Sequence, residues 1–169
     1  MKYWIDLFTW NTWQEFLNAG GQVSGFREKR WRSVQSMKSG DILLCYLTGL
    51  SRFVGALEVT GTPFKDNNPI WGEDVFPSRI PVRVVISLLP EHAVPITSLR
   101  DQLSYFQNMK SPHSWSGHFR GSPTEEKAQD AAIIISALEN AVNAPVYREY
   151  DVRKLERKVP IFYETEAGS

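Results

Sequence analysis

The chain has 169 residues, a formal net charge of zero at neutral pH and 42% hydrophobic residues, which suit one folded domain with an ordinary core. The balanced charge argues against tight, non-specific binding of duplex DNA, which usually requires a strongly basic domain. No apolar run approaches the roughly 20 residues that cross a bilayer, so we expect no membrane partner.

A single cysteine and the first residues together favour a reducing compartment. Cys45 has no second cysteine with which to form an internal disulfide. The first residues do not resemble a signal peptide, because Asp6 interrupts the apolar stretch and no small-residue cleavage site follows. We therefore expect a cytoplasmic protein.

The first residues predict a strand, a short helix and a second strand. Residues 3–8 combine aromatic and β-branched side chains, a composition typical of a strand. Thr12 and Glu15 form a capping box that predicts the start of a helix, and the glycine pair at 20–21 predicts its end. Residues 22–26 can form the second strand.

A hairpin is expected next. Residues 30–37 predict one or two helical turns, with Trp31 facing the core. Residues 42–47 are almost continuously apolar and predict a buried strand. Residues 53–60 predict its partner strand, joined to it by a hairpin loop at 48–51.

A long segment without periodicity follows the hairpin. Residues 61–77 contain three prolines together with Trp71 and Phe76. Loops of this length are usually functional or disordered, and the apolar side chains here are costly to leave in water. Residues 79–88 alternate basic and aliphatic side chains and predict a half-buried strand, and residues 96–103 predict a short helix or turn.

A long helix is expected near the end of the folded part. Ser122 resembles a helix cap, with Pro123 at the first helical position and Glu125 closing a capping box. The helix would bury one apolar stripe, made of Ala128, Ala131, Ala132, Ile135, Leu138 and Val142.

Short strands outnumber helices, and few signals for repeated βαβ units are present. This balance predicts an α+β fold, with a small mixed sheet curled toward a barrel and helices packed outside it. We expect residues 1–144 to form this domain. Residues 145–169 mix charges with scattered apolar side chains and are expected to be a C-terminal extension or linker.

A basic, aromatic-bearing segment is the most distinctive feature of the chain. Residues 25–39 carry five Lys or Arg and one acid, and they run into a turn that opens the strand at 42. Cations can bind phosphate and flat rings can stack on bases, so this pattern favours a single-stranded or flipped nucleotide. The phosphate-binding candidates are Arg27, Lys29, Arg30 and Arg32, although a solvated charged face would have the same composition.

Two further aromatic clusters, around Trp71 and Trp115, could complete a pocket for a base. Trp115 and Phe119 can either stack on a flipped base or plug the core, and Trp71 can be either a pocket wall or a loop anchor. Trp4 and Trp13 are expected to be structural. The candidate pocket residues are Ser24, Gly25, Phe26, Trp71, Trp115, His118 and Phe119.

The sequence contains no set of residues that predicts catalysis, a cofactor or a metal. His113 and His118 have no second cysteine or His-Glu-x-x-His motif with which to form a familiar zinc site. Cys45 lies inside an apolar strand, where a thiol is normally inert. We therefore expect a binding module rather than an enzyme.

The order and spacing of short motifs over residues 1–142 resemble the EVE domain, a member of the PUA-like superfamily related to YTH domains. The matching motifs are Tyr3-Trp4-Ile5, Gly25-Phe26-Arg27, Met37-Lys38-x-Gly40-Asp41, Leu43-Leu44-x-Tyr46, Phe53-Val54-Gly55-Ala56-x-Glu58-Val59, Phe76-Pro77-x-Arg79-Ile80-x-Val82 and Ser114-Trp115-Ser116-x-His118-Phe119-x-Gly121.

The resemblance implies a pseudo-barrel with an aromatic pocket for one base, usually a chemically modified one. It also implies a role as the N-terminal reader of a modification-dependent restriction protein, which binds modified DNA ahead of a motor or nuclease domain. The alternative is a PUA-like module that recognises modified or structured RNA. The segment from Tyr150 onward resembles the connector in such fusions.

The chain departs from the family at one position of the pocket. Many EVE domains carry a Trp just before the Gly-[Val/Phe]-Arg motif, where this chain has Val23-Ser24. Either another ring (Phe26, Trp31 or Trp71) replaces it, or the pocket is altered and its ligand differs.

Overall fold

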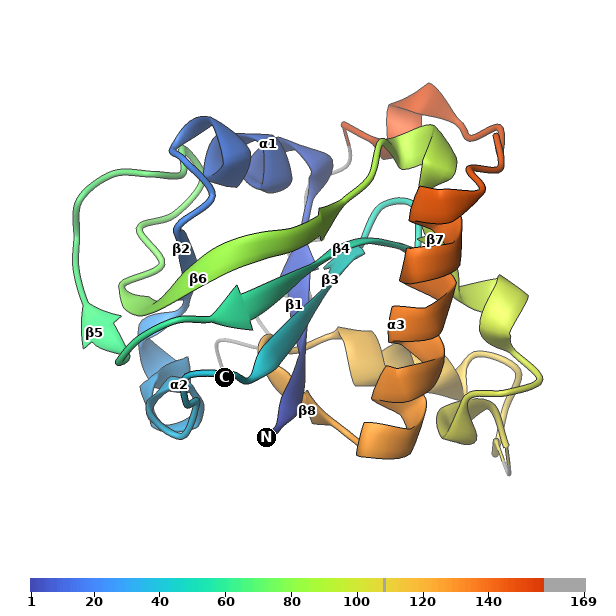
Figure 1. Ribbon diagram of the computed structural model, residues 1–169, viewed down its shortest axis with the longest axis horizontal. Coiled ribbons are helices and arrows are strands. Elements are labelled where there is room, and N and C mark those ends of the chain that lie inside the picture. The colour runs from blue at the N-terminus through green and yellow to red at the C-terminus, as the bar shows by residue number, and fades with distance from the viewer. Residues whose placement is uncertain (108, 157–169) are drawn as a thin grey trace.

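A curled, mixed sheet of eight strands forms the centre of the computed structural model, which describes residues 1–107 and 109–156 (Figure 1). Its main path runs in the order β2-β6-β4-β3-β1-β8, with β5 beside β6 and β7 beside β4. β1 and β3 are parallel, and the other pairs are antiparallel. The strands are β1 (Tyr3–Phe8), β2 (Val23–Phe26), β3 (Ile42–Leu47), β4 (Arg52–Val59), β5 (Phe64–Lys65), β6 (Ser78–Ser87), β7 (Val94–Pro95) and β8 (Thr124–Glu126).

Helices and helical turns pack against this sheet, so the predicted α+β class is confirmed. The α-helices are α1 (Trp10–Asn18), α2 (Trp31–Gln35) and α3 (Ala128–Asn143). Within the described residues, short 3-10 turns accompany them: η1 (Glu28–Arg30), η2 (Pro90–His92), η3 (Ile96–Leu99), η4 (Ser104–Phe106), η5 (Ser114–Phe119) and η6 (Val152–Lys154). In Figure 1, α3 lies to the right of the sheet, whereas α1 lies above its left part and α2 below it.

The sheet separates two hydrophobic cores, which explains the continuous apolar run of β3. Leu43 and Leu47 belong to a first core that contains Trp13 of α1. Leu44, between them, belongs to a second core that contains Leu138 of α3. A strand covered on both faces needs apolar side chains at every position rather than at alternate ones.

The turn before β3 has a structural role. Gly40 has a φ of 95°, in the left-handed region that favours glycine. Asp41 is buried, and its carboxylate accepts hydrogen bonds from the backbone N–H groups of Lys2 (2.9 Å) and Lys38 (3.0 Å) and from Trp4 Nε1 (3.3 Å). The predicted turn is confirmed, and its acid fastens the start of β1 to the start of β3.

The first helix begins earlier than the sequence predicts. Thr9 is the N-cap of α1, and its hydroxyl accepts from Thr12 N–H while Thr12 Oγ1 accepts from Thr9 N–H. The capping box is therefore Thr9 with Thr12, and the predicted Thr12–Glu15 box is wrong. Glu15 instead accepts a hydrogen bond from Gly72 N–H at 2.9 Å, which ties α1 to the long loop after β5.

The predicted start of the long helix is also wrong. Residues 124–126 form β8, which pairs antiparallel with residues 3–5 of β1, and α3 begins only at Ala128. Pairing with an open strand edge satisfies these backbone groups in place of a first helical turn. The shift changes the buried face, which contains Asp130, Ala131, Ile134, Leu138 and Ala141, whereas Ala128, Ala132 and Val142 are exposed.

The curled sheet leaves an opening between β1 and β2. β8 pairs only with residues 3–5 of β1, so the outer edge of the last β1 residues is uncovered by a strand within the described part of the chain. The N–H of Leu7 at this edge donates instead to Ser122 Oγ at 3.0 Å. A hydrogen bond of 2.6 Å from Ser24 Oγ to Asp6 Oδ2 joins β2 to β1 across the opening.

A buried arginine helps to fasten the described part of the C-terminal extension to the domain, beside a backbone hydrogen bond from Arg148 N–H to the carbonyl oxygen of Glu91. The Arg52 guanidinium is buried and donates to the carbonyl oxygens of Pro90 (2.9 Å), Arg148 (3.2 Å) and Glu149 (2.7 Å). The first residues after α3 therefore lie against β4 and η2. The boundary at 144–145 stays a prediction, and the part of the predicted extension at 157–169 lies outside the described residues.

Candidate functional site

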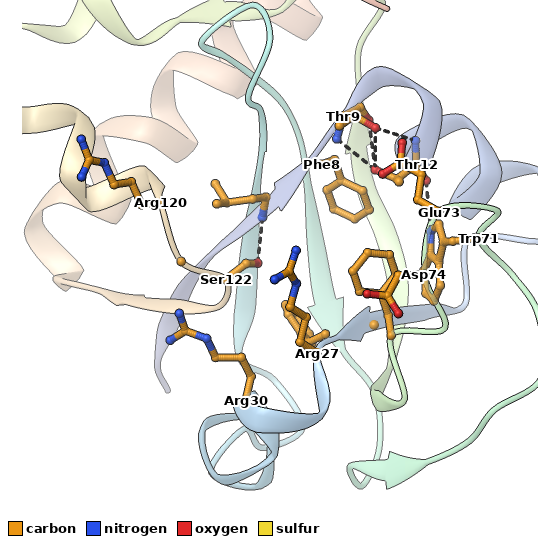
Figure 2. A pocket seen from close by; sticks show the side chains of 15 residues that line it. Phe8, Thr9, Thr12, Arg27, Arg30, Trp71, Glu73, Asp74, Arg120 and Ser122 are labelled. Carbon is orange, nitrogen blue, oxygen red and sulfur yellow. Dashed lines mark hydrogen bonds between the residues drawn. The ribbon is translucent and has the colours of Figure 1, made fainter. Parts of the chain in front are cut away.

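A pocket of about 310 Å³ lies at the opening between β1 and β2 (Figure 2). Phe8 from β1 and Gly25 and Phe26 from β2 line its inner part. The loop at 71–76 and the segment at 120–122 form its two sides. The volume is at the low end of the roughly 300–1,000 Å³ range of small-molecule sites.

One wall of the pocket is aromatic. The ring of Trp71 is nearly perpendicular to that of Phe76, with centroids 5.4 Å apart. Trp71 Nε1 donates to the carbonyl oxygen of Thr12 at 3.2 Å, which fixes the indole against α1. Gly25 allows this arrangement, because a Cβ at that position would lie 2.6 Å from the Trp71 ring. Any larger residue at position 25 would displace the indole.

A buried arginine holds the loop that carries this wall. Arg79 of β6 is 1% exposed, and its guanidinium donates to the carbonyl oxygens of Asn68, Val75 and Phe76 at 2.5–3.2 Å. Its Cζ also lies 5.6 Å from the centre of the Trp71 ring. These contacts fix the loop even though Phe76 has a φ of 48°, a strained conformation for a residue other than glycine.

Three arginines from separate segments line the other side of the pocket; in Figure 2 the Arg27 side chain lies toward its middle, whereas those of Arg30 and Arg120 extend away from Trp71. Figure 2 shows Arg27, after β2, together with Arg30 of η1 and Arg120, after η5. Arg30 rests on the backbone of Gly121, because a Cβ there would lie 2.5 Å from its Nη2. Arg120 was not among the sequence candidates, since nothing in its local sequence indicates that it approaches residues 27–30.

The other predicted phosphate contacts lie outside the pocket. Lys29 is in η1 and Arg32 is in α2, and neither lines the cavity. Partial desolvation and the neighbouring charges of Arg30 and Arg27 lower the pKa of Lys29. The predicted set is therefore divided, with two of its cations beside the pocket and two on the surface that leads to it.

Two acids face the arginines across the pocket. Glu73 and Asp74 follow Trp71 in the loop, and both are exposed. Asp74 Oδ1 accepts from Val75 N–H at 2.6 Å, which orients its carboxylate. The pocket therefore has a cationic side and an anionic side, with aromatic rings between them.

The hydroxyl of Ser24 does not reach the pocket. Ser24 is fully buried, and its Oγ donates to Asp6 beneath the cavity floor. Burial raises the pKa of Asp6 to about 7, and hydrogen bonds from Ser24 and Ser122 counteract part of that rise. The sequence indicated Asp6 only as an interruption of an apolar stretch. Its alternation with Trp4 and Phe8 could have indicated that it points inward.

Trp115, His118 and Phe119 lie away from this pocket, in a second aromatic cluster. Phe119 is buried in the core beneath α3, and its ring stacks on Tyr46 with centroids 4.2 Å apart. Trp115 packs against the same core. His118 stacks on Tyr105 and lies 3.2 Å, through Nε2, from Glu126 Oε1. Of the predicted pocket residues, Gly25, Phe26 and Trp71 lie together at the pocket. Trp115, His118 and Phe119 lie elsewhere, in the second cluster.

The other tryptophans contribute to the first core, and the described residues hold neither a metal cluster nor a membrane-spanning helix. Trp4 and Trp13 are buried in the first core, and Trp10 and Trp31 pack partly against it. The described residues contain no group of three or more His, Cys, Asp or Glu side chains arranged to hold a metal ion. Within residues 1–107 and 109–156, no helix combines the length and apolarity that crossing a bilayer requires.

Comparison with known proteins identifies the fold. No protein-family model matches the chain, and no curated protein matches its sequence. Solved structures do match it. The YTH domain of Zygosaccharomyces rouxii MRB1, solved in complex with N6-methyladenosine RNA, has a TM-score of 0.60 and 15% identity, and the match covers 88% of this chain and 90% of that one.

Two bacterial proteins have the same fold. Atu2648 from Agrobacterium tumefaciens has a TM-score of 0.55 and 17% identity, over 88% of this chain and 100% of that chain. Rpa0253 from Rhodopseudomonas palustris has a TM-score of 0.58 and 12% identity, and the match covers 82% of this chain and 94% of that chain. At these identities the likeness establishes a YTH-like and PUA-like fold, as the sequence predicted, and it leaves function to be argued from the site.

Proposed function

We propose that this chain is a non-enzymatic binding module that holds one unpaired base of a nucleic acid in the pocket between β1 and β2. The observation that carries the proposal is the composition of the cavity walls. Trp71, which is 6% exposed, and the half-buried Phe76 border one side of the cavity, and Arg27, Arg30 and Arg120 line the other. A base can stack on the rings while its flanking phosphates meet the arginines.

The energies involved are consistent with capture of a single base. Extruding a base from a stack costs a few kcal/mol. Stacking on a protein ring recovers roughly 1–3 kcal/mol per base, and hydrogen bonds to the base edge add to this. A methyl group in a fitted cavity contributes about 0.8 kcal/mol more, so a modified base can shift the balance toward binding.

The basic surface next to the pocket extends the proposal to the backbone of the strand. Lys29 and Arg32 lie near Arg30 in sequence and outside the pocket, where they can contact phosphates that flank the bound base. Such contacts position a strand without reading its sequence. Specificity then depends on the pocket, and the affinity depends on both parts.

RNA is one candidate ligand. The YTH domain of MRB1 shares the fold and was solved with N6-methyladenosine RNA, which supports RNA as the nucleic acid. The other candidate is DNA with a modified base. In that case the chain would be the DNA-binding module of a modification-dependent restriction system, with an attached or associated motor or nuclease. That version is supported by the sequence resemblance to EVE domains and assumes a cytoplasmic location.

The proposal is tested by titration with single-stranded oligonucleotides that differ only in one modified base. DNA and RNA versions of each are compared, and binding is followed by fluorescence and by salt dependence. We expect binding in the micromolar range or tighter for one modified base, and we expect Trp71→Ala to remove the preference for it. Equal binding of modified and unmodified strands by the wild type would contradict a reader of modified bases, and no binding to any strand would contradict the proposal as a whole.

A further inference from the structure

A second cavity, of about 430 Å³, adjoins the pocket between β1 and β2 (the base pocket) at the start of α1. Thr9 and Glu73 line both cavities, and both lie in the upper part of Figure 2. The other lining residues come from the first turns of α1 and from the C-terminal extension: Trp10, Asn11, Gln14, Val152, Leu155 and Glu156. Because the two cavities share part of their lining, a strand that occupies the first can reach the second.

Trp10 gives the second cavity an aromatic wall that is held in place. It is the first residue of α1 and directly follows the N-cap Thr9, whose hydroxyl accepts from Thr12 N–H at 3.0 Å. Trp10 packs partly against the first core and is half-buried. A ring that is already fixed offers a stacking surface without the entropy cost of ordering a mobile side chain.

The charge of the second cavity favours a base rather than a phosphate. Among the described residues, two acids line it, Glu73 and Glu156, and no Lys or Arg does. The base pocket, by contrast, is lined by three arginines. Carboxylates repel phosphate and accept hydrogen bonds from the amine of a base edge. The amide of the exposed Gln14 adds a group that both donates and accepts.

The part of the C-terminal extension that lines the second cavity follows a segment fastened to the domain. Arg52 donates to the carbonyl oxygens of Arg148 (3.2 Å) and Glu149 (2.7 Å), a few residues before η6. Val152 of η6 and Leu155, directly after it, then line the cavity together with residues of α1. This wall therefore belongs to the folded structure.

We propose that the second cavity holds the base next to the one in the base pocket, so that the protein reads two consecutive nucleotides. This rests on the proposed function and extends it to the neighbouring nucleotide. The neighbouring base stacks on Trp10 and directs its amine to the carboxylates of Glu73 and Glu156. Adenine, cytosine and guanine carry such an amine, whereas uracil and thymine do not. The C-terminal extension is then part of the nucleic-acid interface.

The first test uses single strands that are abasic except for one modified base, N6-methyladenine or 5-methylcytosine, in RNA and in DNA. Matched strands carry one further cytosine on the 5′ side or on the 3′ side of that base. In the wild type, the cytosine on one of the two sides should raise the affinity roughly fivefold or more, because one further base stacks on a ring. An equal gain on both sides, or no gain on either, would overturn the proposal.

Three variants test which residues produce this gain. Trp10→Leu keeps apolar volume against the first core and removes the aromatic face, so it should abolish the gain from the neighbouring cytosine. Leu155→Ser changes the wall that the extension supplies and should reduce the gain. Val146→Ser is the matched control, because Val146 is an apolar residue of the same extension, is 51% exposed and lines neither cavity. A full gain in Trp10→Leu, or an equal loss in Leu155→Ser and Val146→Ser, would contradict the proposed site.

The preference for an amine has its own measurement. Uracil presents a carbonyl where cytosine presents an amine, so the gain from a neighbouring uracil should be severalfold smaller in the wild type. Glu156→Gln, whose amide donates as well as accepts, should bind the two strands more equally. Glu139→Gln makes the same change of charge on the exposed surface of α3 and should keep the wild-type preference. Equal gains from cytosine and uracil in the wild type would overturn the assignment of an amine to this cavity.

NMR separates this inference from the reader function. The indole N–H signal of Trp71 reports on the base pocket, and that of Trp10 reports on the second cavity. The strand with one base should shift the Trp71 signal alone, and the extended strand should shift both. A Trp71 response without a Trp10 response would overturn this inference and leave the reader function standing. A Trp10 response without a Trp71 response would support a base site beside α1 and contradict the base pocket, and a response of neither would overturn both.

Discussion

The two aromatic clusters of this protein look alike in sequence and differ in structure. Each contains a Trp in an irregular segment with a Phe a few residues later, Trp71 with Phe76 and Trp115 with Phe119. The first pair lines a pocket beside three arginines. The second pair packs into the core beneath α3, where Phe119 stacks on Tyr46.

The two pairs of rings differ in their surroundings. Arg79 holds the Trp71 loop by its carbonyl oxygens at the open side of the curled sheet, so the rings have a cavity beside them. Trp115 and Phe119 instead pack against other rings of the second core, Trp115 against Phe106 and Phe119 against Tyr46. Aromatic content alone therefore does not identify a base-binding site; a neighbouring cavity is needed.

The largest expected effect is on stability and concerns the second cluster. Phe119→Ala removes a buried ring and should lower the free energy of unfolding by about 3–5 kcal/mol and the melting temperature by roughly 10 °C. Thermal and urea unfolding measure both. The folded fraction should still bind oligonucleotides with wild-type affinity, and a selective loss of affinity without loss of stability would place the ligand at this cluster instead.

The next effect is on binding and concerns Trp71. Replacing the indole by alanine should weaken oligonucleotide binding by about 1–3 kcal/mol, or roughly 5-fold to 150-fold, because stacking is lost. Trp71→Leu is the matched variant that keeps apolar volume against Gly25 while removing the aromatic face. Trp115→Ala serves as the control. If Trp115→Ala weakens binding more than Trp71→Leu does, the assignment of the two clusters is reversed.

A glycine pair tests the geometry of the pocket wall without removing a ring. A Cβ at Gly25 would lie 2.6 Å from Trp71, whereas a Cβ at Gly117 would meet no atom within 4 Å. Gly25→Ala should therefore shift the NMR signal of the Trp71 indole N–H and weaken binding severalfold, while Gly117→Ala leaves both unchanged. This signal is measured in the free protein, and an unchanged Trp71 indole N–H signal in Gly25→Ala would contradict the described packing.

The smallest effect concerns charge. Arg30→Gln should weaken binding to all sequences alike and reduce the slope of log affinity against log salt by about 1, because one phosphate contact is lost. Gly121→Ala, which displaces the Arg30 guanidinium, should have a similar effect in a protein of unchanged charge. Binding isotherms over a salt series provide the measurement. A change in base preference rather than in the salt slope would mean that Arg30 contacts the base.

Much of the fold could be predicted from local sequence. The strands at 3–8, 42–47 and 79–88 follow from their composition, and the structure confirms them within a residue or two at each end. The start of α3 could not be predicted in this way. The apparent capping box at Ser122 and Glu125 does not form, because residues 124–126 pair with the open edge of β1 instead. That edge exists only in the folded sheet.

Only those residues of the candidate site that are close together in sequence were predicted. Gly25, Phe26, Arg27 and Arg30 are close in sequence, so one motif indicated them together. Arg120 and Asp6 were not indicated, because their roles depend on residues about 90 and 18 positions away, Arg30 and Ser24. Local patterns report neighbours along the chain, whereas a pocket depends on neighbours in space.

Local sequence was enough to predict the class of fold, a buried strand at residues 42–47 and a basic, aromatic-bearing segment. These depend on side-chain periodicity and composition, which are local properties. Which tryptophan borders a cavity, which arginines line it and which acid lies near it depend on the folded arrangement of the chain. Curling of the sheet brings β1, β2 and residues 120–122 to one opening, and sequence separation carries no information about that closure.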